Sequence, residues 1–399
     1  MSIIKHKGNG ILVDHGKFTK EIYRGCRAQS QNSISSEFTH VKLTYKDIYF
    51  KIQSPHLSRE KDTLTSRRCK KRKLPENEEE VSAKMYHLTV SPMLQEMTKN
   101  LALELANENN SLCEQQSQKL LEDISPKCTI CSDLCRNLCL SSILKNASNI
   151  AITGNDPIHL AKNDVDGKIV KYIGETPRTI CVSNEVYLLP TQCTFLLSEL
   201  GNMEPLTRHS MKSGGFNIIV IDPPWENKSA KRGSKYPWLS LKEILSVPLD
   251  KLMNENCLVF VWVTNKQKYH KFIRNDLFPK YNIHFTCEWH WVKVTTQGQP
   301  VFDFDSVHKR PYETIIIGQT WKHKCNEKHI EPTVITSVPC TIHSHKPPLD
   351  KIIRTLVTDL PNPKCLELFA RNLLPKWTSW GNEVLEMQHI KHFQAKNQN

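Results

Sequence analysis

The sequence contains no apolar run long enough to cross a membrane. Its 399 residues are 39% apolar, the mean hydropathy is −0.47, and no stretch approaches the roughly 18–20 consecutive apolar residues of a spanning helix. The first segment, Met1 to Lys7, also lacks the apolar core of a secretory signal, so we expect no export. Fourteen cysteines at irregular spacings then favour free thiols over a disulfide framework.

The chain also lacks the common signatures of dinucleotide and metal sites. No G-x-G-x-x-G loop is present, which counts against a standard dinucleotide site, and the histidines form no H-E-x-x-H pattern. One group of cysteines is closely spaced: Cys128, Cys131, Cys135 and Cys139. This group lies in a helix-like stretch and lacks the paired spacing of structural zinc sites. We therefore predict no metal site, and zinc at these cysteines is the alternative interpretation.

Positive charge is in excess, with 54 Lys and Arg against 41 Asp and Glu and a net charge of +13. An excess of this size favours a polyanionic partner. A basic cluster, Arg67–Lys73, is followed by a glutamate-rich run that ends at Glu80. Opposed blocks of like charge resist packing, which predicts a solvated linker. The cluster also suits nuclear import or an added contact with nucleic acid, and we expect a nuclear location, with the cytoplasm as a second one.

The pattern of apolar residues divides the chain into five parts. We predict a small N-terminal module at 1–55, a charged linker at 56–85, a mainly helical middle region at 86–188, an α/β domain at 189–390 and a tail at 391–399. In the middle region Met93, Met97, Leu101 and Leu105 have the spacing of one helix face. In the α/β domain the nearly continuous apolar runs Phe216–Ile221 and Cys257–Val263 are typical of strands buried on both faces. Strands that alternate with helices at this spacing predict a doubly wound, Rossmann-like sheet.

The first of these strands is followed directly by Asp222, Pro223, Pro224 and Trp225. Ligands of open α/β sheets bind beyond the carboxyl ends of the strands. Two prolines remove two backbone donors and stiffen the turn, so we expect their carbonyls to be open to hydrogen bonds. A carboxylate, a backbone acceptor and an aromatic ring together suit a planar base with an exocyclic amine. The alternative is an ordinary turn after a strand.

This motif and the segments after it resemble the DPPW-type nucleic-acid adenine-N6 methyltransferases, the MT-A seventy-kDa family. The likeness covers about the last half of the chain and, within the family, is greatest to the methyltransferase-like four branch. The segments that carry it are Ile221–Trp225, Val259–Asn265, Lys309–Glu313, Glu367–Asn372, Asn372–Pro375 and Trp377–Glu383.

The resemblance implies S-adenosylmethionine as cofactor and the N6 amine of adenine as methyl acceptor. Asp222 and the Pro223 carbonyl would accept the two N–H bonds of the amine, Pro224 would complete the turn and Trp225 would stack on the base. The N6 lone pair is delocalised into the ring, and accepting both N–H bonds localises it for in-line attack. The implied fold is a class I methyltransferase domain with permuted motif order, in which the cofactor strand Cys365–Phe369 follows the catalytic strand.

The resemblance also implies two further sets of site residues. The cofactor-binding set is Asp222, Phe369, Arg371, Asn372, Asn382 and Glu383, where amide and carboxylate groups suit a ribose diol and an adenine edge and Arg371 suits a carboxylate. This sequence departs from the family pattern at Ala370, where glycine is usual, and in a shorter turn before Pro375. The substrate-binding set is Trp225, Asn227, Lys228, Tyr236, Trp238, Tyr312 and Glu313, several of which lie in a basic loop suited to closing over a nucleotide. The alternative for this loop is a solvated surface segment.

We therefore predict an enzyme that methylates adenine N6 in RNA. Resemblance to the methyltransferase-like four branch narrows the expected substrate to 2′-O-methyladenosine in spliceosomal small nuclear RNA. DNA adenine is the competing substrate, and a cytosine-N4 enzyme is a further alternative, since cytosine has a similar exocyclic amine. The rival from another class is a catalytically silent nucleic-acid-binding subunit of a methyltransferase complex, although no protein partner is indicated by the sequence.

Overall fold

The computed structural model describes residues 3–31, 38–56, 77–109, 150–152, 158–226, 238–306, 309–321, 329–357 and 362–395. Three of the predicted features lie outside these ranges. They are the cysteine group Cys128–Cys139, the basic cluster Arg67–Lys73 and the loop 227–237, which includes Asn227, Lys228 and Tyr236.

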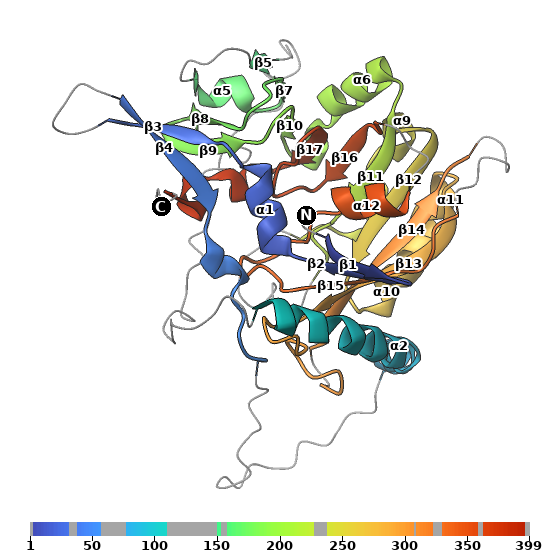
Figure 1. The fold of residues 1–399 in the computed structure, drawn as a ribbon. Helices are drawn as coiled ribbons and strands as arrows, with labels where there is room; N and C mark the ends of the chain where they lie inside the picture. Colours follow the sequence, from blue (N-terminus) through green and yellow to red (C-terminus); the bar gives the residue numbers. More distant parts are fainter. Residues whose placement is uncertain are drawn as a thin grey trace, which may run out of the picture.

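A single large sheet of twelve strands dominates the part of the chain that the structure describes (Figure 1). In spatial order the strands are β1 (Ile3–Lys7), β2 (Gly10–Val13), β15 (Val334–Ser337), β13 (His284–Lys293), β14 (Tyr312–Gln319), β12 (Met253–Val263), β11 (Phe216–Ile221), β16 (Cys365–Leu368), β17 (Trp377–Gly381), β10 (Thr194–Leu197), β7 (Ile169–Tyr172) and β5 (Ile150–Ile152). The central strands β12, β11, β16, β17 and β10 are parallel to their neighbours in this order. The Rossmann-like fold is confirmed.

Helices cover both faces of this sheet. The α-helices are α1 (His15–Ile22), α2 (Glu78–Asn109), α5 (Lys162–Val165), α6 (Glu204–Ser213), α8 (Leu241–Leu245), α9 (Leu249–Leu252), α10 (Gln267–Phe272), α11 (Phe278–Lys280) and α12 (Asp350–Leu356). The 3₁₀-helices are η1 (Asp47–Phe50), η2 (Leu200–Asn202), η5 (Glu386–Gln388) and η6 (Ile390–His392), and η3 (Ile273–Leu277) is a π-helix.

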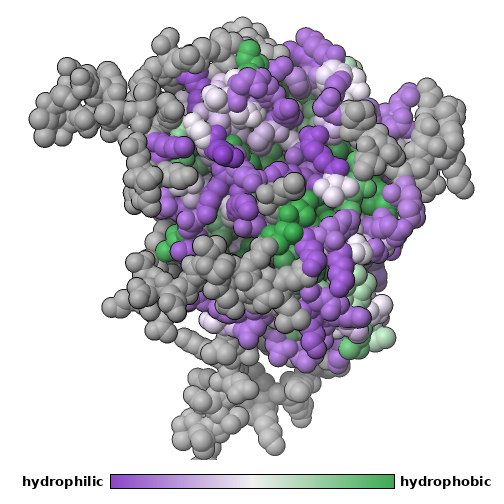
Figure 2. Space-filling view, in the orientation of Figure 1, coloured by the Kyte–Doolittle hydropathy of each residue, from purple (hydrophilic) through white to green (hydrophobic). Residues whose placement is uncertain are grey.

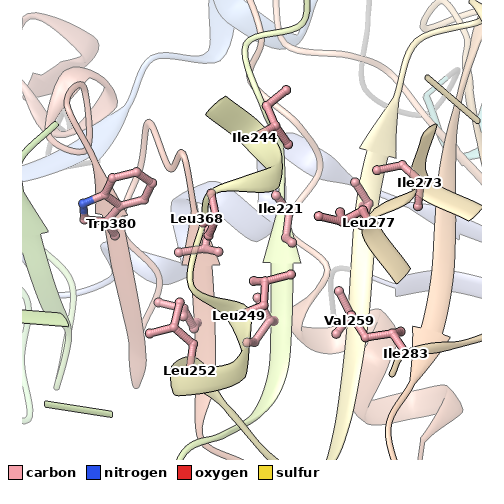
Figure 3. Close-up of a cluster of buried hydrophobic side chains, with 14 of the residues drawn as sticks. Ile221, Ile244, Leu249, Leu252, Val259, Ile273, Leu277, Ile283, Leu368 and Trp380 are labelled. Atoms are coloured by element: carbon pink, nitrogen blue, oxygen red, sulfur yellow. The ribbon is translucent and has the colours of Figure 1, made fainter. Parts of the chain in front are cut away.

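The apolar strand runs form a core on each side of the sheet, because successive side chains of a strand point to opposite faces. On one face Ile221, Val259 and Leu368 pack with residues of α8, α9 and η3 (Figure 3). On the other face Ile218 and Val220 pack in a cluster with residues of α1 and α12. Burial on both faces explains why these strands read as continuous apolar runs.

Polar side chains dominate the face of the molecule shown in Figure 2, where apolar side chains gather in a band across the middle. Within the described residues, no helix combines the length and the apolar character needed to cross a membrane.

The structure differs from the predicted boundaries in the N-terminal half. β1 and β2 join the large sheet, where β2 pairs in parallel with β15, instead of staying within a module at 1–55. In the middle region 86–188 the helix α2 is followed, within the described residues, mainly by strands. Among the described residues there are two smaller sheets, one formed by β3 (Arg27–Gln31), β4 (Phe38–Tyr45) and β18 (Phe393–Ala395), the other by β6 (Ile158–Leu160), β8 (Arg178–Val182) and β9 (Glu185–Leu189). Strands this short need partners from distant segments, and the predicted tail supplies one in β18, which pairs with β4.

The buried face of α2 also differs from the predicted one. Leu94 and Leu101 are buried against β2 and β15, whereas Met93 is 41% exposed. The buried stripe continues through His87, Ser91 and Thr98. These polar residues hide the stripe from a search for apolar periodicity.

Candidate active site

Asp222 stands at the carboxyl end of β11, between the neighbouring strands β12 and β16. Its backbone N–H donates to the Leu368 carbonyl at 3.3 Å, which continues the pairing of β11 with β16 by one step. Asp222 follows Ile218 and Val220 in the two-residue alternation of the strand, so it faces the side of the sheet that carries α12. The residues of the motif therefore lie at the edge where a ligand of an α/β sheet is expected.

The two proline carbonyls are already engaged within the turn. The Trp225 N–H donates to the Pro223 carbonyl at 2.8 Å, and the Leu239 N–H donates to the Pro224 carbonyl at 3.1 Å. The prediction that these carbonyls are open acceptors is therefore only half right. Each carbonyl oxygen has two lone pairs, so the Pro223 oxygen keeps one for a ligand.

Trp225 packs into the core beneath the turn and does not present an open ring. Its indole is 9% exposed and stacks on Tyr269, with ring centroids 4.4 Å apart. Its Nε1–H donates to the Trp262 carbonyl at 2.9 Å. The structure corrects the predicted stacking role, because the ring is already held by Tyr269. Trp225 instead fixes the turn that carries Asp222.

Lys346 links Asp222 to Glu313 in a half-buried group of charges. Lys346 Nζ lies 3.5 Å from Asp222 Oδ1 and 2.7 Å from Glu313 Oε2. Lys293 forms an ion pair with the other oxygen of Glu313. The four side chains are only 17–23% exposed, so these interactions are poorly screened by solvent.

The electrostatics of this group separate its two carboxylates. Burial raises the pKa of Asp222 above its ordinary value, although Lys346 opposes the shift. Burial acts in the same direction on Glu313, but Lys293 and Lys346 outweigh it and hold the pKa of Glu313 well below its usual range. The pKa of Lys346 is raised, because Asp222 and Glu313 outweigh its burial. At neutral pH Glu313 and Lys346 are therefore both charged.

Tyr312 and Glu313 were both predicted to bind substrate, but they point to opposite faces of β14. Glu313 joins the charged group beside Asp222. The Tyr312 ring is 1% exposed, hydrogen-bonds through its hydroxyl with His87 Nδ1 at 3.0 Å, and lies beneath α2. The prediction for the Tyr312 side chain is wrong, because alternation along a strand allows only one of two successive side chains to face the site.

The residues after β16 reach the same edge of the sheet. Phe369 has a positive φ of 60° and packs its ring on Trp380 at 5.0 Å. A Cβ at Gly381 would stand 2.6 Å from the Ala370 carbonyl oxygen, so glycine allows β17 to approach the turn closely. Just beyond, Arg371 Nε lies 2.9 Å from Glu383 Oε2.

The structure places two further residues of the predicted sets in different surroundings. Asn372 borders a cavity of about 10 Å³ together with Tyr45 and His345. Trp238 is 40% exposed next to the segment 227–237. Asn382 directly follows β17, which ends at Gly381. It precedes Glu383, another residue of the predicted cofactor-binding set.

Three charged residues near Asp222 were missed from the sequence. Lys346 and Lys293 lie on distant segments, and no local pattern relates them to the motif. Glu367 lies in the segment Glu367–Asn372, but the resemblance implied no role for it. It pairs with Val220 across β16 and β11, and burial, followed by the charge of Asp222, raises its pKa to about 8.

The comparisons with known proteins agree with this geometry. Residues 216–383 match the MT-A70 family model. This range runs from the start of β11 through Glu383 and contains Asp222, Glu313 and Lys346. This part of the chain is similar to the MT-A70 family. The resemblance inferred from the motif is confirmed.

Individual relatives show the same relationship. The chain is 42% identical over 245 residues to the N(6)-adenine-specific methyltransferase METTL4 of Homo sapiens, covering 59% of this chain and 51% of that protein. It is 34% identical to the N6-methyladenosine RNA methyltransferase MTA1 of Pyricularia oryzae, over 51% of this chain and 55% of that protein. It is 32% identical to the DNA N6-methyl methyltransferase of Caenorhabditis elegans, over 58% of this chain and 63% of that protein. The alignments with METTL4 thus span about half the length of those relatives.

Methyltransferases of the MT-A70 family depend on S-adenosylmethionine, and the side chains at this edge suit that cofactor. The cofactor carries an amino-acid end, a positively charged sulfur, a ribose diol and an adenine ring. Cations suited to its carboxylate are present in Lys346 and Arg371, and carboxylates suited to its ammonium and hydroxyl groups are present in Asp222 and Glu383. The donor set therefore fits the cofactor, and Lys346 joins the residues that would hold it.

The raised pKa of Glu367 generates a prediction for stability. The folded state holds a proton on Glu367 up to about pH 8, whereas the unfolded chain loses it near pH 4.5. The contribution of protonated Glu367 to the free energy of unfolding is therefore complete below about pH 4.5. It is lost as the pH rises to about 8. The variant Glu367→Gln stays neutral at every pH. Over this pH range the free energy of unfolding of the wild type should therefore fall by about a few kcal/mol relative to that of the variant.

Denaturant unfolding of both proteins at several pH values between 4.5 and 8.5 measures this difference. The exposed Glu255 offers a control, since Glu255→Gln should keep the pH dependence of the wild type. A constant difference between wild type and Glu367→Gln across the range would contradict the assigned protonation of Glu367.

Proposed function

We propose that the chain is an S-adenosylmethionine-dependent methyltransferase that acts on adenine N6 in RNA. The observation that carries the proposal is the position of the Asp222 carboxylate. It stands at the carboxyl end of a central strand, on a turn fixed by Pro223 and Trp225, and it is 19% exposed beside Lys346. An acceptor held in this way suits an amine that must be aimed during reaction.

The residues of the turn supply the chemistry of orientation. Asp222 accepts one N–H of the adenine amine, and the second lone pair of the Pro223 oxygen accepts the other. Both contacts draw the nitrogen lone pair out of conjugation with the ring, so that it becomes a better nucleophile. S-adenosylmethionine supplies an electrophilic methyl group on positively charged sulfur. The negative charge of Asp222 favours the positive charge that develops on the amine nitrogen as it is methylated.

Lys346 keeps Asp222 in the charged form that this role requires. Burial alone favours a neutral carboxyl, and a protonated Asp222 would lose part of its acceptor capacity. The ammonium 3.5 Å away opposes that shift. Glu313 in turn holds Lys346 in place through its 2.7 Å ion pair. Lys346 and Glu313 thus act as positioning residues for Asp222.

The finer proposal is that the substrate adenosine is 2′-O-methylated and lies in spliceosomal small nuclear RNA. It is supported by the likeness to the methyltransferase-like four branch, and METTL4 of Homo sapiens is named an N(6)-adenine-specific methyltransferase. DNA is the second candidate substrate, favoured by the likeness to the DNA N6-methyl methyltransferase of Caenorhabditis elegans. We also propose a nuclear location, supported by the basic cluster Arg67–Lys73 and the net charge of +13.

Neutralising Asp222 tests the proposed role. Asp222→Asn keeps the shape of the side chain but removes its charge, and kcat for methyl transfer should fall at least about 100-fold. Transfer from labelled S-adenosylmethionine is measured on four oligonucleotides: RNA with adenosine, the same RNA with 2′-O-methyladenosine, single-stranded DNA and duplex DNA. The exposed carboxylate of Asp250 provides the matched control, because Asp250→Asn should retain full activity.

Preference for the 2′-O-methylated RNA would support the finer proposal, and preference for either DNA would replace it. Equal activity of wild type and Asp222→Asn would contradict the role of Asp222. Absence of transfer to all four substrates, with RNA still bound, would favour the silent binding subunit.

Removing the Lys346 charge should change the pH dependence of the reaction. Without the ammonium the pKa of Asp222 rises further, so the acid limb of the profile of kcat/KM against pH should move to higher pH in Lys346→Met. Lys351→Met is the control, because Lys351 pairs with Glu21 away from the site. A loss of activity by the same factor at every pH would instead mean that Lys346 does not control the ionisation of Asp222.

A further inference from the structure

A groove of about 770 Å³ opens at the end of the sheet where β16 and β17 begin. Asp222 lies at the opposite end, where the parallel strands finish. Lys364 and Lys376, which line it, immediately precede β16 and β17. Lys171 of β7 and Arg354 of α12 contribute from either side. Figure 1 shows β16, β17, β10 and β7 side by side, with α12 close to β16. The groove thus lies where parallel strands begin, whereas the candidate active site lies where they end.

Positive charge prevails among the side chains that line this groove. Lys171, Arg354, Lys364 and Lys376 are all exposed. Among the described lining residues, Asp350 carries the only carboxylate. It already accepts hydrogen bonds from Arg354 Nε and Trp377 Nε1, both at 2.8 Å.

Two local hydrogen bonds involve residues that line the groove. The Lys364 ammonium donates to the Ser213 carbonyl, which fixes its position without neutralising its charge. The amide nitrogen of Gln192 donates to Glu175 at 2.6 Å, so one further carboxylate stands near the groove. Four cations still outnumber the two acidic groups, and the groove is electropositive.

The composition of the groove suits a chain of phosphates. Cations around an open groove bind phosphodiester oxygens irrespective of base sequence. Sites for small molecules, by contrast, are mostly apolar and have few polar groups. A volume of about 770 Å³ is also much larger than one phosphate requires.

The distance between the groove and Asp222 sets the length of nucleic acid that can reach both. β16 spans four residues, and at about 3.3 Å per residue the two edges are separated by roughly 15 Å through the sheet. A nucleic acid must pass around the sheet, which is a longer path. A trinucleotide centred on the target adenine has one nucleotide on either side and therefore cannot occupy both places.

We propose that this groove binds the phosphodiester backbone of the RNA substrate at a distance from the target adenine. The proposal rests on the function proposed above. It explains why a methyltransferase domain would carry an electropositive surface at the end of the sheet away from its site. It also predicts that affinity depends on the length of the RNA.

Two charge-reversed double variants test this proposal. The groove variant is Lys171→Glu with Lys376→Glu, and the control is Lys7→Glu with Lys99→Glu, which are exposed on β1 and α2. Both variants change the net charge equally, so a difference between them reports the groove and not the overall field. Thermal unfolding checks that both are folded, and Lys171→Gln with Lys376→Gln replaces the groove variant if it is not.

Binding is measured with an RNA of about 40 nucleotides and with a trinucleotide centred on the adenosine, at several salt concentrations. The groove variant should bind the long RNA about tenfold more weakly than the wild type near 0.15 M salt. The slope of log affinity against log salt concentration should also be shallower by about 1.4, because two phosphate contacts are lost. The control should change affinity less than about twofold, since its lysines lie elsewhere. For the short RNA all three proteins should bind equally and methylate at the same rate.

Equal weakening by the groove variant and the control would overturn the proposal, as would equal weakening for short and long RNA. Unchanged binding of the long RNA would also overturn it and would leave an acidic protein surface as the class of partner to examine. Failure of the proposed function gives a different result, because the wild type would then methylate neither RNA, while the affinities would still report on the groove.

Discussion

The parallel pairing of β11 with β16 is the interaction on which the candidate site depends. Ile221 pairs with Leu368, so Asp222 and Phe369 emerge side by side although they are far apart in the sequence. Each strand is buried on both faces, and this burial fixes the register. A slip of one residue would turn Asp222 into the other core. Because the strands are parallel, their carboxyl ends lie together near Asp222. Their amino ends lie together at the other end of the sheet, near Lys364 and Lys376.

Burial of charge is the second constraint on the site. Asp222, Glu313, Glu367, Lys293 and Lys346 lie where water screens them poorly, and only some of them are paired. Lys346 stabilises the charged form of Asp222, whereas Glu367 avoids the cost of an unpaired buried charge by keeping its proton to about pH 8. Carboxyl groups on neighbouring strands thus take different protonation states because their partners differ.

The sequence predicted the parts of the structure that depend on local pattern. Continuous apolar runs identified β11 and β12, and the residues after β11 identified the edge where the site lies. Contacts between distant segments were beyond such patterns. Lys346 has no local signal, and the polar residues of the buried α2 face, such as Ser91 and Thr98, conceal its periodicity. Trp225 was misjudged because its residue type suits stacking on a base as well as packing on Tyr269.

The central claim is that the turn at Asp222 orients an adenine amine for methylation. Its most direct test is to digest RNA that the purified protein has methylated and to identify the modified nucleoside by mass spectrometry. The account predicts methyl on N6 of adenosine and none in the reaction with Asp222→Asn. Methyl on cytosine N4, on a ribose hydroxyl or on no nucleoside would contradict it.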